Sequence, residues 1–201
     1  MNRGWLKREN IPLAIAAAVV LAVVLAYMAP AEATLGEAVK LVYVHAALMW
    51  VGFGMLTLGG LAGLLSWFWR RGSALDWSYG FLYVGLGLLL ATGVLGTVTA
   101  KITWGAVFWG EPRLAMLGEI LAAGAVTVAA GKLSNSEILA AGGNLAFAAV
   151  AWVLVLRTEL VIHPASPIFS SESAAIRVFP LLITVVLAAA GLLAVRYLAE
   201  D

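Results

Sequence analysis

The chain contains two histidines, His45 and His163, and no cysteine. Without thiols there is no disulfide, no thiolate metal site and no covalent thioether link to a cofactor. A neutral imidazole is a good ligand for iron, zinc or copper. Two imidazoles are too few for a zinc site, but they suffice for a haem iron, whose other four ligands come from the porphyrin. The alternative for each histidine is an interfacial side chain that is hydrogen-bonded to a carbonyl or to water.

A second group with chemical potential is the aromatic segment 101–114, KITWGAVFWGEPRL, which carries Trp104, Phe108 and Trp109 between two cations. The spacing of Trp104 and Phe108 predicts a shared face if the segment is helical. Such a face would hold a planar apolar ligand with charge at its rim. Aromatic residues also gather at membrane interfaces because they are amphipathic, and composition supports the two interpretations equally.

These residues lie in a strongly apolar chain. Of the 201 residues, 63% are hydrophobic and 11% are charged, and the net charge is +1. The mean hydropathy is +1.01. This composition excludes disorder, and it argues against nucleic-acid binding because there is no basic excess. It is typical of a multi-span membrane protein.

Six apolar runs are long enough to span a bilayer. None alternates apolar with polar residues, so an outer-membrane barrel is disfavoured. The first run is longer than the apolar region of a signal peptide, and we interpret it as a retained span. The prediction is an all-α membrane protein with one six-helix domain over 1–201, whose spans are about 11–29, 38–69, 75–100, 112–131, 138–162 and 178–198.

The distribution of basic residues predicts the orientation. Positive charge favours the cytoplasmic side, and the cations at the first span and first same-side loop place both termini in the cytoplasm of a multi-pass inner-membrane protein. That side would hold Arg3, Lys7, Arg8, Arg70, Arg71, Lys132 and Arg196. The outer side would hold both histidines and the cations Lys40, Lys101, Arg113, Arg157 and Arg177.

Three segments resemble a known family. The run from Trp104 through Gly105 and Phe108 to Arg113 and Leu114 is similar to the tryptophan-rich signature of haem-handling proteins, approximately W-G-x-x-W-x-W-D-x-R-L. The runs 40–50 and 163–166 resemble that family's two histidine regions. Length and span number match the CcmC-type haem exporters of cytochrome c biogenesis. Phe108 and Gly110 stand where the family usually has tryptophan, and Glu111 replaces aspartate.

The resemblance implies a transient, non-covalent site for haem b on the outer face, with His45 and His163 as axial ligands of the iron. Trp104, Gly105, Phe108 and Trp109 would lie against the porphyrin. The haem propionates need cations, and Arg113 is the first candidate because guanidinium pairs bidentately with carboxylate. The other outer-side candidates are Lys101, Arg157 and Arg177, and each cation is alternatively an ordinary snorkelling residue.

The implied role is delivery of haem to a membrane-anchored haem chaperone, beside an ABC-type ATPase, a second membrane subunit and a small single-span accessory protein. The chain has no P-loop motif, so nucleotide hydrolysis would belong to a partner, and we expect a non-enzyme. One alternative is a bis-histidine b-type membrane cytochrome that carries electrons. Another is a cofactor-free permease subunit. Glu119, Arg157 and Glu159 are intramembrane ionisable groups to which the sequence assigns no site.

Overall fold

The computed structural model describes residues 7–69, 72–159 and 171–200, and these residues form a helical bundle. Six helices are long and apolar enough to cross a membrane, which confirms the predicted all-α membrane class. After a short 3-10 turn, Arg8–Asn10, they are α1 (Ile11–Met28), α2 (Val39–Trp69), α3 (Gly72–Trp104), α4 (Pro112–Leu133), α5 (Glu137–Arg157) and α6 (Ala174–Ala199).

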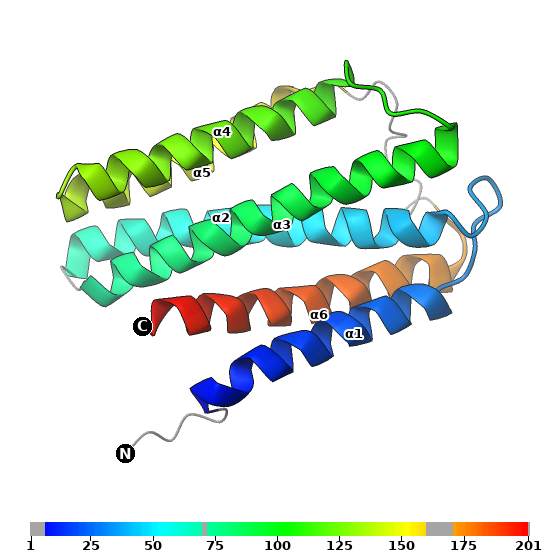
Figure 1. The fold of residues 1–201 in the computed structure, drawn as a ribbon, viewed down its shortest axis with the longest axis horizontal. Coiled ribbons are helices and arrows are strands. Elements are labelled where there is room, and N and C mark those ends of the chain that lie inside the picture. Colours follow the sequence, from blue (N-terminus) through cyan, green and yellow to red (C-terminus); the bar gives the residue numbers. More distant parts are fainter. Residues whose placement is uncertain (1–6, 70–71, 160–170, 201) are drawn as a thin grey trace.

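The helices run up and down along one common direction (Figure 1). The long helices α2 and α3 lie in the middle, α4 and α5 lie on one side of them, and α6 and α1 lie on the other. The start of α1 and the end of α6 lie at the same end of the bundle as the turn between α4 and α5. The starts of α2, α4 and α6 lie at the opposite end, together with the aromatic segment. Which end faces the cytoplasm stays a prediction.

The interior is built by close approach of small residues, as membrane helices require when lipid is as apolar as their side chains. A Cβ on Gly52 would lie 2.9 Å from Leu89 Cδ2, and a Cβ on Gly85 would lie 2.7 Å from Leu56 Cδ2. These two glycines lie opposite each other and bring α2 and α3 together at this point. Gly54 and Gly87 on the same two helices face open space.

A buried polar contact joins three helices about two turns from the starts of α3 and α5. The Asn144 Nδ2 group on α5 donates to Ser78 Oγ on α3 over 2.9 Å. The Ser78 hydroxyl in turn donates to the Gly59 carbonyl on α2 over 2.7 Å. Ser78 and Asn144 are 0% and 2% exposed. Because an unpaired polar group is costly in hydrocarbon, this contact fixes the register of α2, α3 and α5.

Helix ends differ from the apolar runs by a few residues. Helix α3 continues to Trp104, past the predicted end at 100, and α6 begins at Ala174 rather than 178. Helix α5 ends at Arg157, and Thr158 is extended. The predicted fifth span ran to 162, and its last three positions lie outside the described residues.

Candidate functional site

His45 lies on α2 with its ring against α3. Its Nδ1 atom lies 3.1 Å from the backbone carbonyl oxygen of Thr92. A carbonyl oxygen can only accept, so Nδ1 is the donor, and in the neutral ring Nε2 is then the nitrogen that carries the lone pair. Metal-ligating histidines usually donate their second ring N–H to a carbonyl or carboxylate in this way. His45 therefore has the tautomer and the fixed orientation of an Nε2 ligand.

Gly96 makes this position possible. A Cβ at residue 96 would lie 2.8 Å from His45 Cε1 and 3.2 Å from its Nδ1, so a side chain there would displace the ring. Thr92 itself is 3% exposed. Sequence reasoning missed both Thr92 and Gly96, because one supplies only a backbone carbonyl and the other only space.

His45 lies early in α2, as the sequence predicted. It is six positions after Val39, where α2 begins, which is about 9 Å of helix at roughly 1.5 Å per residue. Its neighbour Gly96 is eight positions before Trp104, where α3 ends, which is about 12 Å. The imidazole thus lies about two turns inside the bundle, between two helices. Gly96, and not the end of a helix, provides the space that the ring occupies.

The aromatic segment begins as helix and then turns. Trp104 is the last residue of α3, and Gly105 follows with φ +75°, a left-handed conformation that ends helices. Residues 105–111 are not helical, so the condition for a shared helical face is not met. The turn nevertheless brings the Trp104 and Phe108 rings together edge to face, with centroids 6.5 Å apart.

The aromatic rings of this turn are open to the surroundings. Trp109 is 76% exposed, and Trp104 and Phe108 are each 43% exposed. Such large exposed rings at the end of a bundle provide apolar area that a ligand can cover. The geometry is compatible with both interpretations left open by composition, the platform and the interfacial belt.

Glu111 and Pro112 start α4. Glu111 is 8% exposed and is the N-cap, and its Oε2 accepts the backbone N–H of Leu114 over 3.0 Å. Pro112 occupies the first turn, as expected. Arg113 follows on the half-buried part of this turn, and its Nε is buried without a hydrogen-bond partner. A buried guanidinium N–H with an unmet hydrogen bond is the donor that an anionic group would satisfy.

The other predicted anion-binding cations lie in different settings. Lys101 Nζ donates to the Gly105 carbonyl over 2.7 Å, so this cation caps the end of α3. Arg177 is exposed in the first turn of α6. Arg157 lies in a cleft that also contains Glu119 and Glu159. Two carboxylates beside one guanidinium make that cleft unfavourable for a propionate.

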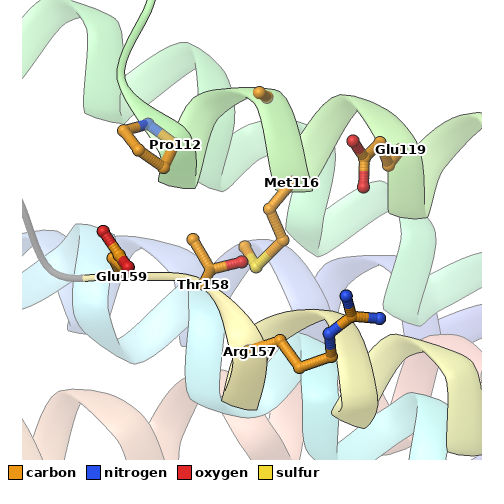
Figure 2. A pocket seen from close by; sticks show the side chains of 7 residues that line it. Pro112, Met116, Glu119, Arg157, Thr158 and Glu159 are labelled. Atoms are coloured by element: carbon orange, nitrogen blue, oxygen red, sulfur yellow. The ribbon is translucent and has the colours of Figure 1, made fainter.

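This cleft of about 360 Å³ lies between the start of α4 and the end of α5, and it is lined by Pro112, Ala115, Met116, Glu119, Arg157, Thr158 and Glu159. In Figure 2 the guanidinium extends from α5 away from Thr158 and Glu159, toward the part of the cleft that Glu119 lines from α4. The structure thus groups Arg157 with two carboxylates, Glu119 and Glu159, to which sequence reasoning gave no site.

His163 lies outside the described residues, and with it the second histidine region, 163–166. The described parts of α5 and α6 bracket it: Arg157 ends α5, and Ala174 begins α6. Helix α6 begins at the same end of the bundle at which α2 begins and α3 ends (Figure 1). Among the predicted ligands and contacts, the described chain therefore places His45, Trp104, Gly105, Phe108, Trp109 and Arg113 toward one end of the bundle.

In comparisons with known proteins, no family model and no curated protein matches the chain. The resemblance to haem-handling proteins therefore rests on the three short segments alone.

Proposed function

We propose that the chain binds haem non-covalently and delivers it to a haem chaperone during c-type cytochrome maturation, acting at the outer face of the cytoplasmic membrane. Haem is the cargo in this proposal, and the chain is a carrier, not an enzyme. The observation that carries the proposal is the orientation of His45. Its Nδ1 is hydrogen-bonded to the Thr92 carbonyl, which supports Nε2 as the iron ligand. His163 is proposed as the second ligand from the resemblance.

The exposed aromatic turn supports a role in receiving and releasing the cargo. A porphyrin has wide apolar faces, and covering apolar area contributes about 25 cal/mol per Å². Trp109 is the most exposed of the three rings, at 76%, so it offers the most apolar area for a ligand to cover. Arg113, with its unsatisfied buried Nε, is proposed to bind a propionate. Because the turn lies open at the bundle end, cargo held against it can leave without crossing the helices.

The binding test uses the purified chain in nanodiscs, titrated with ferric haem and followed by absorption. We expect His45→Ala and His163→Ala each to weaken binding at least tenfold. Trp50→Phe is the matched control, because Trp50 is a half-exposed aromatic residue on the same helix as His45 but outside the aromatic turn. Wild-type affinity in both histidine variants would overturn the ligand assignment.

A b-type electron carrier is the second candidate, and the depth of His45 favours it. Haems of such carriers usually sit between facing helices, and His45 lies between α2 and α3 about two turns inside the bundle. Mixing the haem-loaded chain with excess apomyoglobin separates the two functions. A carrier of haem gives up its cargo and loses its absorption to myoglobin, whereas an electron carrier retains the haem and is reversibly reduced.

The orientation is tested by labelling cysteines with a membrane-impermeant thiol reagent, because the natural chain contains none. Glu37→Cys lies in the connection between α1 and α2, and Asn135→Cys lies between α4 and α5 at the other end. In intact cells we expect the reagent to label position 37 and not position 135. The reverse pattern would place the aromatic turn in the cytoplasm and contradict the proposed delivery outside.

The proposed partners are the chaperone that receives haem, an ABC-type ATPase, a second membrane subunit and a small single-span protein. They are proposed from the resemblance and not from any surface of this chain. Their test is co-purification of the tagged chain with an ATPase whose nucleotide hydrolysis depends on the complex. If no ATPase co-purifies with the chain in stoichiometric amount, that part of the proposal is overturned.

A further inference from the structure

The cleft between α4 and α5 has a charge arrangement that the haem proposal does not use. Glu119 and Glu159 face it with Arg157, so the three ionisable side chains carry a net charge of −1. Within the described residues, none of these side chains makes an ion pair or a hydrogen bond. The hydroxyl of the intervening Thr158 donates instead to the Leu154 carbonyl of its own helix.

Glu119 is exposed within the membrane-spanning length of α4. It is seven positions after Pro112 on a 22-residue helix, which is about 10 Å along a span of about 33 Å. The hydrocarbon core is about 30 Å thick. Glu119 is exposed, and ionisable residues within spans normally face a partner or an aqueous cavity. A lipid acyl chain provides neither, and a lipid ammonium group stays at the headgroup level.

The neighbouring surface of α4 is shaped for close helix contact. Its exposed surface carries small residues at alternating three- and four-residue spacing, and one large apolar side chain, Val126 (68% exposed), lies beside them; the small residues are Ala115, Gly118, Ala122, Ala125 and Ala129. A Cβ on Gly118 would meet nothing within 4 Å. The opposite face of α4, with Met116, Leu117, Ile120 and Gly124, is buried in the bundle. Ala115 belongs to both the small-residue face and the cleft, so the two are continuous.

From the cleft, its excess negative charge and this face together, we propose that α4 docks a membrane-spanning helix of a partner that carries a lysine or arginine opposite Glu119. The cation enters the cleft and pairs with Glu119, while the small residues allow the two backbones to approach. A second copy of this chain does not fit, because a two-fold contact along α4 places each Glu119 beside the other copy's Glu119. This docking is independent of haem binding.

The test measures helix association in lipid vesicles by energy transfer. A donor dye is attached at Leu133→Cys, an exposed position at the far end of α4. The probe is a synthetic 22-residue transmembrane helix of leucine and alanine with one lysine about 10 Å from one end, and the matched probe has leucine instead of that lysine. We expect the lysine helix to associate at least fivefold more tightly than the leucine helix.

Variants of the chain separate charge from shape. Glu119→Gln is expected to abolish the preference for lysine, and Glu137→Gln, at the start of α5 and away from the cleft, to retain it. Ala122→Ile keeps Glu119 and is expected to weaken both probes, so it tests the face even if Glu119→Gln does not fold. Equal affinity for the two probes, or an unchanged preference in Glu119→Gln, would overturn the proposal. The proposal would also be overturned if the chain forms dimers that Ala122→Ile disrupts and that the lysine helix does not displace.

Discussion

Replacing Gly96 with alanine tests the positioning of His45 without removing the histidine. The new Cβ would lie 2.8 Å from His45 Cε1, where ordinary contacts begin at 3.4 Å, so the ring has to move by at least about 0.6 Å. The 3.1 Å contact between Nδ1 and the Thr92 carbonyl cannot survive that movement unchanged. Loss of the partner that orients a metal-bound histidine typically lowers metal affinity 10- to 100-fold, which is about 1.4–2.8 kcal/mol.

The fold should tolerate this substitution. Alanine is about 1 kcal/mol more favourable than glycine in a helix interior, and the lost hydrogen bond costs about 1 kcal/mol. We therefore expect a 10- to 100-fold weaker haem affinity with a change in unfolding free energy below about 1 kcal/mol. Haem titration and thermal unfolding in the same nanodiscs measure the two quantities.

Gly87→Ala is the matched control, because Gly87 lies on the same helix with nothing within 4 Å of its built Cβ. It is expected to keep wild-type haem affinity and to be slightly more stable. If Gly96→Ala binds haem as tightly as Gly87→Ala, the contact of His45 with α3 does not position an iron ligand. Equal weakening in both variants would also refute the reasoning, because the effect would then be general to α3.

Three further predictions concern the connections at the same end of the bundle. Glu111→Ala removes the N-cap of α4 and should cost about 1 kcal/mol of stability, whereas Glu111→Asp should keep most of it; equal melting temperatures for the wild type and the alanine variant would contradict this. Trp109→Ala should weaken haem binding by about 2 kcal/mol, or roughly 30-fold, if haem covers about half of a ring that buries 150–250 Å²; an unchanged titration would exclude this contact. Backbone N–H groups of Leu35 and Thr34 hydrogen-bond to Glu32 and lower the pKa of its carboxyl below its ordinary value. The connection between α1 and α2 is therefore stabilised above the ordinary glutamate pKa and loses this stabilisation as pH falls through the lowered pKa. Amide protection there, measured relative to the intrinsic exchange rate at each pH, should fall in acid in the wild type and stay constant in Glu32→Gln.

The six helices were predictable because apolar runs of about 20 residues dictate membrane spans. The residues at which the helices begin and end were less predictable. Lys101 and Thr103 interrupt the apolar run of the third span, yet they are helical: Lys101 reaches the Gly105 carbonyl and Thr103 bonds to the Thr99 carbonyl. Local hydrogen bonds of this kind offset polarity within a helix, and a hydropathy pattern does not represent them.

The candidate site was predictable only in part. The chemistry of the histidines and of the tryptophan-glycine pair is indicated by their residue types. Gly105 is also the residue that ends α3. Thr92 and Gly96 were not predictable, because the register between α2 and α3 decides which carbonyl and which gap meet His45. The grouping of Glu119 with Arg157 likewise depends on how α4 packs against α5.

The most direct test of the central claim is the coordination of iron in the haem-loaded chain, measured by absorption and electron paramagnetic resonance. The proposed pair of ligands, His45 and His163, predicts a six-coordinate, low-spin ferric haem in the wild type and a high-spin or empty protein after alanine substitution of either histidine. A wild-type chain that takes up no haem, or a low-spin spectrum that persists without His45, would contradict the account.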